Sequence, residues 1–372
     1  MICDKCKADR TDLATSGGRD LCVTCLAEEI ERLLAGREVR LMEVCGTHTV
    51  SIFRSGLKSL LPPSLRLISG PGCPVCVTPQ RKIDTIIAYA RRPDTIITTF
   101  GDMLNVPGTE SSLRTEKSRG AEIRMVYSPL ESLALARENP EKKVIFLGIG
   151  FETTIPTGAA TVIEARKSGR DNFFLIPAGK LIPPAMEFLL KQGDAGIDGF
   201  LCPGHVSVII GTGPYRRIAE KFGIPCVVAG FEPLDILAAI RELVRLINEG
   251  KPEVKNLYPR VVREEGNPRA REIMNEVFQP ADTEWRGLGV IPESGLVMRP
   301  EFEEYDISLT DPVKIAPSRE NPACICGEIL RGVNEPPDCP AFKDTCTPDH
   351  PLGPCMVSSE GTCAAWYRYG KK

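Results

Sequence analysis

Between about residues 40 and 230, short apolar runs rich in β-branched residues alternate with longer segments in which apolar residues recur every three or four positions. The short runs are typical of buried strands and lie at 40–45, 65–70, 95–101, 123–128, 143–150, 173–179, 199–204 and 224–230. The segments between them predict helices at 82–92, 130–138, 157–168, 184–192 and 215–222, and a further helix follows at 234–248. This alternation indicates parallel sheets covered by helices.

The pattern therefore predicts an α/β fold with two parallel-sheet domains around a cleft, the first at 36–128 and the second at 129–255. Prolines and glycines interrupt the segment 256–372, which is predicted to return to the first domain and to end in a small irregular domain. Residues 1–30 predict a small zinc-ribbon-like module, with a helix at 26–34. Because ligands bind at the carboxyl ends of parallel strands, we expect the site in the loops that follow the strands.

The composition and net charge of the chain narrow its possible functions and location. The chain has 42% hydrophobic and 26% charged residues and a formal net charge of −3, so it has no basic excess that would attract a nucleic acid. It shows no signal-peptide pattern at its start and no apolar run long enough for a membrane span, and we expect a cytoplasmic protein. In that reducing compartment its 15 cysteines indicate metal binding or redox chemistry.

The first four cysteines form two CxxC pairs, Cys3 with Cys6 and Cys22 with Cys25, separated by fifteen residues. This spacing predicts a structural zinc site closed by four thiolates. Such a site usually stabilises a small module or forms a surface that docks a partner. A catalytic role is disfavoured, because a catalytic zinc keeps an open coordination position and four thiolates leave none.

Six further cysteines crowd into the last fifty residues of the chain. They are Cys324, Cys326, Cys339, Cys346, Cys355 and Cys363. The residues between them are rich in proline and glycine and cannot build long helices, so the segment is expected to fold around something other than an apolar core. A thiolate-bound metal or cluster is the natural candidate.

Two loops after predicted strands carry reactive thiols. Cys45 ends a strand three residues before His48, and amide dipoles would lower the thiol pKa if a helix begins there. A buried cysteine that only packs is an equally good interpretation of this motif. The loop 70–76 holds Cys73 and Cys76 in a CxxC with a proline between them, which favours a redox dithiol over half of a zinc site.

Three further loops offer polar groups. Glu152 and Thr153 follow one glycine-rich strand end, His205 follows another, and Glu232 precedes the helix at 234–248. None of these loops has a full nucleotide-binding pattern or the elbow of a serine hydrolase. Three thiols, two imidazoles and several hydroxyls suit a redox-active iron site better than hydrolysis.

At this point the motifs resemble those of a known family. The strings CGTHT (45–49), GPGCPVC (70–76), GFETT (150–154), PGHVS (203–207), GFEPLD (230–235) and CMVSSEGTC (355–363) closely resemble the HypD family of [NiFe]-hydrogenase maturation proteins. The resemblance covers about residues 36–370. The N-terminal CxxC pairs lie outside the family's usual pattern.

The resemblance implies assembly of an Fe(CN)2CO group before its transfer to a hydrogenase. The partners it implies are a HypC-like chaperone, a HypE-like protein that delivers cyanide derived from a carbamoyl group supplied through HypF, and the hydrogenase large subunit reached through the chaperone. No nucleic acid and no membrane are implied. The protein would be a redox-active assembly scaffold rather than a conventional turnover enzyme.

The resemblance also implies roles for single residues. Cys45 would hold iron together with a cysteine of the chaperone, and His48 would help to position the iron or the incoming ligand. Cys73 and Cys76 would be a dithiol that exchanges electrons with the site. The tail would bind a [4Fe-4S] cluster, with Cys339, Cys346, Cys363 and one of Cys324 and Cys326 as favoured ligands. Glu152, Thr153, His205 and Glu232 complete the predicted catalytic set.

Two other classes of protein remain open on the sequence. A disulfide reductase resembling ferredoxin:thioredoxin reductase would use the cluster to reduce Cys73 and Cys76 and then a protein substrate. A structural zinc protein that only docks other chains would hold zinc at both ends and would not depend on Cys45.

Overall fold

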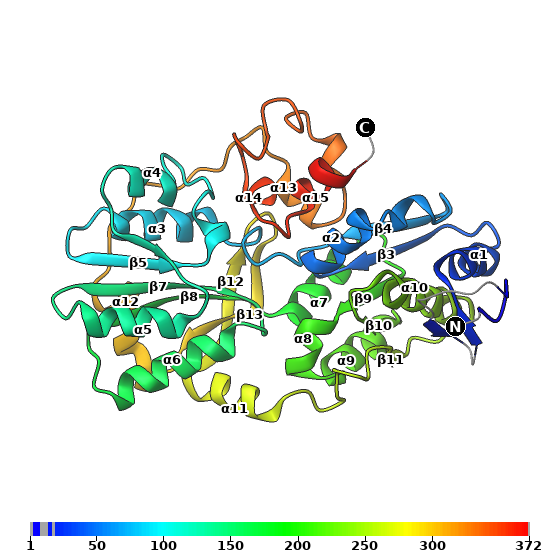
Figure 1. Cartoon of the computed structure of the whole chain (residues 1–372), viewed down its shortest axis with the longest axis horizontal. Coiled ribbons are helices and arrows are strands. Elements are labelled where there is room, and N and C mark those ends of the chain that lie inside the picture. Colours follow the sequence, from blue (N-terminus) through cyan, green and yellow to red (C-terminus); the bar gives the residue numbers. More distant parts are fainter. Residues whose placement is uncertain (1–2, 8–13, 17–18, 371–372) are drawn as a thin grey trace.

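The fold contains two parallel sheets, seen side by side in Figure 1. The computed structural model describes residues 3–7, 14–16 and 19–370, so Met1 and Ile2 and part of the predicted module 1–30 lie outside the described residues. The first sheet has the order β11-β10-β9-β3-β4, and the second has the order β6-β5-β7-β8. All neighbouring strands in both sheets are parallel, as predicted.

Eight of the nine strands in these sheets match the predicted apolar runs, whereas β11 lies outside them. In the first sheet they are β3 (Val39–Glu43), β4 (Leu65–Ser69), β9 (Gly199–Pro203), β10 (Cys226–Ala229) and β11 (Val254–Asn256). In the second they are β5 (Thr95–Thr99), β6 (Ile123–Met125), β7 (Lys143–Gly150) and β8 (Phe173–Gly179). β5 and β9 are buried along their whole length, which explains their continuous apolar or β-branched sequences.

Helices cover both faces of the sheets. They include α2 (Gly46–Arg54), α3 (Gln80–Ala90), α4 (Leu113–Ser118), α5 (Pro129–Glu138), α6 (Ile155–Lys167), α7 (Ile182–Gln192), α8 (Gly204–Ile210), α9 (Gly213–Phe222), α10 (Pro233–Asn248) and α11 (Pro268–Val277). α5 begins with a capping box in which Ser128 and Glu131 satisfy each other's backbone amides. The predicted helices are therefore confirmed, whereas α8 begins inside a segment that the sequence suggested was a loop.

The strand pairing differs from the predicted domain ranges 36–128 and 129–255. The chain builds β3 and β4 in the first sheet, forms all of the second sheet, and then returns to add β9, β10 and β11 to the first. Each predicted range thus contributes strands to both sheets. The apolar rhythm indicates where strands lie but not which strands pair, because every buried parallel strand has the same pattern.

The last third of the chain connects the two sheets. A hairpin of β12 (Phe278–Trp285) and β13 (Gly289–Met298), absent from the predicted elements, packs against β8 and α7. α15 in the tail packs on α2, which follows β3 of the first sheet. The helices of the tail are α12 (Ile307–Thr310), α13 (Cys326–Leu330), α14 (Pro354–Val357) and α15 (Thr362–Tyr369). On the other side, Asp102 accepts hydrogen bonds from the Ser358 hydroxyl at 3.0 Å and the Ser359 amide at 2.9 Å. The part of the tail that carries α13, α14 and α15 therefore lies over both sheets, at the top of Figure 1.

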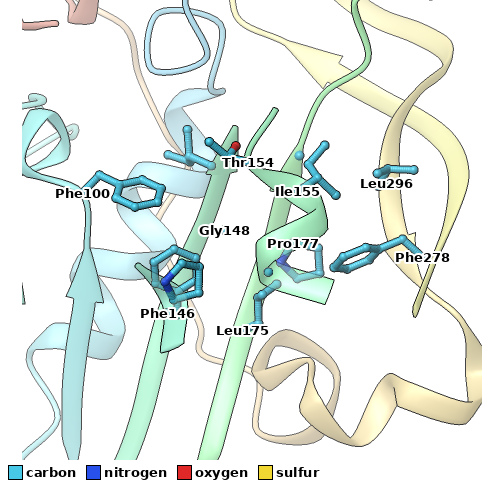
Figure 2. Close-up of a pocket in the computed structure, with 13 residues that line it drawn as sticks. Phe100, Phe146, Gly148, Thr154, Ile155, Leu175, Pro177, Phe278 and Leu296 are labelled. Carbon is cyan, nitrogen blue, oxygen red and sulfur yellow. The ribbon is translucent and has the colours of Figure 1, made fainter. Parts of the chain in front are cut away.

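The hairpin also completes the core of the second sheet. Figure 2 shows Phe278 and Leu296 of the hairpin facing Leu175 and Ile155 across a small apolar cavity. The cavity measures about 20 Å³, enough for roughly one water molecule and too small for an organic ligand. It is a packing defect of the core and not a binding site.

The N-terminal module contacts the rest of the protein through α1 (Val23–Leu34), which packs against α10 beside the first sheet. Leu26, Ile30 and Leu34 are buried in this contact, and Arg241 donates to Glu29 at 3.0 Å beside them. A two-stranded antiparallel sheet of β1 (Ala14–Ser16) and β2 (Arg19–Leu21) precedes the helix. Within the described part of the chain, no helix has the length and apolar character required to cross a membrane.

Candidate functional site

A pocket of about 220 Å³ lies between the carboxyl ends of strands from both sheets. It is lined by Val44, Cys45, Thr47, Gly72, Pro74, Val75, Phe100, Met103, Ile149, Gly150, Phe151, Thr153, Thr154, Pro203, His205, Val206 and Glu360. The lining comes from the ends of β3, β7 and β9, from the CxxC loop and from the tail. The predicted position of the site at strand ends is where this pocket lies.

Cys45 lies at the base of this pocket, directly between β3 and α2. Its backbone is extended, and the backbone amides of His48 and Thr47 form hydrogen bonds to its thiol at the start of the helix. The expected helix after Cys45 is therefore present. The expected low pKa is not, because burial raises the pKa of the Cys45 thiol to about 12, the charge of Glu360 adds to the rise, and the helix amides only oppose it. A bound cation would be needed to hold Cys45 as a thiolate.

Gly72 brings the CxxC loop onto Cys45. The Gly46 amide donates to the Gly72 carbonyl at 3.0 Å, and a Cβ on Gly72 would collide with the backbone of Val44 and Cys45. Only glycine allows this approach between the two thiol-bearing loops.

We therefore expect Gly72→Ala to lower stability by about 1–3 kcal/mol, because backbone atoms cannot rotate away as a side chain would. Thermal unfolding measures the change. The matched control is Gly213→Ala, where a new Cβ would meet nothing within 4 Å and should leave the melting temperature unchanged or slightly raised. A Gly72→Ala protein that melts like the parent would contradict the close approach.

The CxxC thiols lie just behind the pocket wall formed by Pro74 and Val75. The Cys76 amide donates to the Cys73 sulfur at 3.3 Å, and Cys76 is fully buried. Burial holds the pKa of the Cys76 thiol well above its usual range, opposed by a hydrogen bond with the thiol of Cys355 in the tail. The CxxC pair therefore lies close to the tail cysteines, in the same buried cluster.

The tail cysteines converge within the irregular domain. Five of them line one small enclosed space: Cys324, Cys326, Cys339, Cys346 and Cys363. A Cβ on Gly353 would lie 2.6 Å from the Cys324 sulfur, so this glycine leaves room beside the thiols. The sixth, Cys355, is not part of that lining and is in hydrogen-bond contact with Cys326, Cys363 and Cys76. It lies between the group of five and the CxxC pair.

The two predicted histidines both pack against Phe231. Its ring centroid lies 4.7 Å from that of His48 and 4.0 Å from that of His205. The His48 Nε2 donates to the Gly230 carbonyl at 2.8 Å, and burial lowers the pKa of His48 to about 4, so this ring is neutral. His205 lines the pocket beside Glu360, whereas the His48 ring does not.

The remaining predicted residues are split between the pocket and its surroundings. Thr153 lines the pocket. Glu152 lies behind it, where it accepts from the Ile182 amide at 2.9 Å and where burial raises its pKa to about 7. Glu232 precedes α10, is exposed and does not line the pocket.

Two carboxylates that are not among the predicted site residues lie near Cys45. Glu43 is buried, and it accepts from the Cys45 amide at 3.0 Å and from the Thr49 hydroxyl. Glu360 accepts from the Thr47 hydroxyl at 2.6 Å and reaches the pocket from the tail. Period-two alternation along β3 could have placed Glu43 on the same face as Cys45. No local pattern could have placed Glu360, which is more than three hundred residues away.

The N-terminal cysteines form a compact group of four sulfurs. The ligand atoms of Cys3, Cys6, Cys22 and Cys25 all lie within 4.8 Å of one another. The Cys3 and Cys25 sulfurs are 3.7 Å apart and those of Cys6 and Cys22 are 4.0 Å apart. These separations are close to the roughly 3.8 Å edge of a tetrahedron built on Zn–S bonds. The donor set and its geometry fit a closed tetrahedral metal site.

Comparison with known proteins gives one consistent family. The family profile described as HypD, hydrogenase formation hypA family, matches residues 22–370. The chain is 48% identical over 343 residues to the hydrogenase expression/formation protein HupD of Azotobacter chroococcum, with 90% of each chain covered. It is 47% identical over 338 residues to the hydrogenase maturation factor HypD of Escherichia coli, again with 90% of each covered.

An archaeal relative shows similar coverage. A putative hydrogenase expression/formation protein of Methanocaldococcus jannaschii is 44% identical over 344 residues, which is 92% of this chain and 94% of the relative. The profile match begins at Cys22, so Cys3 and Cys6 lie outside it while the pocket and all the tail cysteines lie inside.

Proposed function

The chain belongs to the HypD family of hydrogenase maturation proteins, and from this premise we propose that it is the scaffold on which the Fe(CN)2CO group is assembled. The observation that carries the proposal is the path of sulfur atoms in the structure. It leads from the tail thiols through Cys355 to Cys76 and Cys73, whose loop forms one wall of the pocket around Cys45.

In this proposal the iron group is the cargo, and Cys45 is the thiolate that holds it. Thiolate is a soft ligand that suits low-spin ferrous iron. Most of the pocket wall is apolar, with Val44, Val75 and Phe151 among its residues, and it limits access of water to the bound group. Thr47, Thr153 and His205 supply the polar atoms that could orient incoming ligands. The His48 ring supports the loop from outside the pocket.

The tail thiols fit a [4Fe-4S] cluster, which when bound would supply single electrons. We propose Cys339, Cys346, Cys363 and one of Cys324 and Cys326 as its ligands, because these five line one space and the sulfurs of Cys324 and Cys326 lie only 2.9 Å apart. In the proposed step the Cys355 thiolate attacks Cys76 of a Cys73–Cys76 disulfide, which breaks that bond, frees Cys73 and leaves a Cys355–Cys76 mixed disulfide. Two electrons, which the cluster when bound would supply one at a time, and two protons would return the mixed disulfide to thiols. The restored Cys73–Cys76 dithiol could then give two electrons and two protons to the group held in the pocket as it becomes a disulfide again.

The rival function, a protein disulfide reductase, fits the burial of the dithiol less well. A substrate disulfide must reach the attacking sulfur directly. Cys73 has 3% of its surface exposed and Cys76 none, and the tail covers them. This burial favours chemistry on a small group held inside the protein.

Hydrogenase maturation implies partners in the maturation machinery. We propose a HypC-like chaperone that closes the Cys45 pocket with its own cysteine, a HypE-like cyanide donor, and transfer to the hydrogenase large subunit through the chaperone. We also propose that these steps take place in the cytoplasm, where reduced thiols persist.

Complementation tests the proposal as a whole. In a bacterium that lacks its own HypD-family gene, this chain together with its small chaperone should restore hydrogenase activity. The isolated complex should hold iron in excess of four atoms per chain. Disulfide reductase activity without any gain in hydrogenase activity would favour the rival.

We also propose that Cys3, Cys6, Cys22 and Cys25 hold a structural zinc ion. The pKa of Cys3 is lowered to about 6, chiefly by the Cys6 backbone amide, whereas burial raises the pKa of Cys25 to about 12. Amide hydrogen bonds and a metal charge together would hold all four as thiolates.

Replacement of both Cys3 and Cys6 by serine should therefore remove about one zinc per chain without loss of iron. Metal analysis of the purified protein measures this, with Cys226→Ser as the control, because Cys226 is a buried thiol outside every cysteine group described above. Point variants are preferable to removal of residues 1–30, which would strip Leu26 and Ile30 from α10. Unchanged zinc content in the double variant would contradict the assignment.

A further inference from the structure

A second pocket, of about 400 Å³, lies between the start of α3, the carboxyl end of β8 and the β12–β13 hairpin. It shares no lining residue with the pocket around Cys45. The charged residues that line it are Arg81, Lys82, Lys180, Glu284 and Asp306. An apolar wall includes Pro177, Leu296 and Val313. Neither the family motifs nor the proposed iron chemistry uses these residues.

Lys180 has an incompletely satisfied ammonium group. Its side chain is only 3% exposed, and its Nζ donates to the Glu284 carbonyl at 2.6 Å. The Trp285 ring centroid lies 5.7 Å away. An ammonium has three donors, and among the described residues no carboxylate lies within ion-pairing distance of this one. Buried charges in proteins are usually paired, so an anion bound beside Lys180 would stabilise its ammonium form.

Lys82 lines the same pocket from α3 and is only partly buried. Across the described ranges of the chain, its ammonium makes no hydrogen bond or ion pair. Burial lowers its pKa, opposed by the charge of Asp306. Burial also lowers the pKa of Lys180 to about 7, and repulsion from Lys82 contributes to that fall. The ammonium groups of Lys82 and Lys180 thus line one space, and the charges of Asp306 and Glu284 oppose these falls in pKa only in part.

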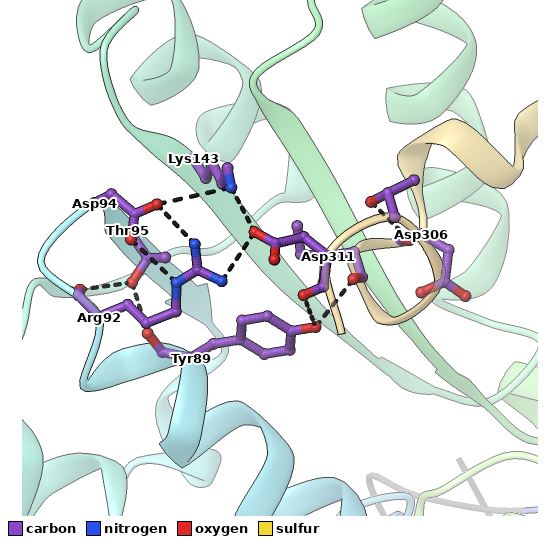
Figure 3. A network of polar contacts seen from close by, with 9 residues as sticks. Tyr89, Arg92, Asp94, Thr95, Lys143, Asp306 and Asp311 are labelled. Atoms are coloured by element: carbon purple, nitrogen blue, oxygen red, sulfur yellow. Dashed lines mark hydrogen bonds and ion pairs between the residues drawn. The ribbon is translucent and has the colours of Figure 1, made fainter. Parts of the chain in front are cut away.

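The far wall of the pocket is held in place by a polar network, shown in Figure 3. The Tyr89 hydroxyl contacts the carbonyls of Ile307 at 3.0 Å and Asp311 at 2.9 Å. The Asp311 carboxylate pairs with Arg92 and Lys143. These contacts fix the segment 306–313 against α3 and β7, so the pocket is formed without a ligand and needs little ordering to bind one.

We propose that this pocket binds a small organic anion whose phosphate or carboxylate group lies between Lys82 and Lys180. Charge-assisted hydrogen bonds from both lysines would satisfy donors that the protein leaves free. The volume is in the range of small-molecule sites, and the apolar wall would contact the body of the ligand. The inference is independent of the proposed iron assembly.

Isothermal titration of the whole protein with two probes, inorganic pyrophosphate and phthalate, tests the proposal. At least one probe should bind with a Kd of about 1 mM or tighter, and the tighter probe identifies the phosphate or the carboxylate class. Lys180→Met and Lys82→Met should each weaken that binding about tenfold or more, because each removes hydrogen bonds to a charged group. If Lys180→Met fails to fold, Lys82→Met alone tests the proposal.

Lys191→Met is the matched control, since Lys191 is an exposed lysine of α7 outside the pocket, and it should bind like the parent. Affinity should also fall as the pH rises from about 6 to about 9, because Lys180 loses its proton in that range. The other charged groups that line the pocket are Arg81 and Lys82 from α3, Glu284 from β12 and Asp306 before α12. Binding of neither probe, or equal binding by the parent and both pocket variants, would overturn the proposal.

Discussion

Replacement of Cys45 by alanine is expected to reduce hydrogenase maturation to background. Removal of residues that only support a metal ligand costs 10–100-fold, so loss of the ligand itself should cost more than about 100-fold. Cys45 is the only cysteine among the residues that line the pocket between the sheets, and no other thiol there could take its place. Hydrogenase activity in the complemented strain measures the loss.

Two controls separate this effect from a folding defect. The visible absorption of the tail cluster should persist in Cys45→Ala, because the tail thiols form a different group. Cys226→Ala removes an equally buried thiol from β10 and should cost only about 1 kcal/mol of stability while maturation continues. Maturation that survives in Cys45→Ala would refute the assigned role.

Replacement of Cys355 by alanine should uncouple the tail from the CxxC pair. Its thiol is fully buried and contacts both Cys76 and the tail thiols Cys326 and Cys363, so the sulfur path breaks without it. Reduction of the Cys73–Cys76 disulfide by electrons from the tail should slow by on the order of tenfold or more, which corresponds to at least about 1.4 kcal/mol in the barrier. Rapid mixing with a reductant, followed by thiol labelling, measures this rate.

The same variant also tests the assignment of the cluster ligands. Because Cys355 does not line the space shared by the other five tail cysteines, the iron content of the tail should remain near the parent value. Cys346→Ala is the contrasting variant and should lose the cluster. Loss of the cluster in Cys355→Ala, or unchanged reduction of the CxxC pair, would show that Cys355 is not a relay.

The sequence predicts individual elements of this fold better than their arrangement. Runs such as 95–101 and 199–204 are apolar because both faces of β5 and β9 are buried, and that property is visible in the chain. The pairing of β3 with β9, which joins residues about 160 positions apart, depends on the whole sheet and leaves no local pattern. The hairpin is not among the predicted elements because the partly buried positions of β12 are Gln279, Ala281 and Thr283, which give no apolar alternation, and because Pro280 lies within the strand.

For the candidate site too, single residues are predictable from the sequence, whereas contacts between distant segments are not. Cys45, Thr153 and His205 were found because each is a reactive or polar residue placed just after an apolar strand. Glu360 lies in the pocket because the tail folds back over both sheets, and the Asp102 contacts with Ser358 and Ser359 that hold it there join distant segments. The raised pKa of Cys45 was also unpredictable, since burial is a property of the packed structure and it outweighs the helix amides.

Infrared spectroscopy of the complex with the small chaperone, purified without oxygen, tests the central claim most directly. The account predicts bands from iron-bound carbon monoxide and cyanide in the parent complex and their absence from the Cys45→Ala complex, with the absorption of the tail cluster equal in both. The same bands in both complexes, or no such bands in the parent while hydrogenase maturation proceeds, would contradict the claim that iron is assembled on Cys45.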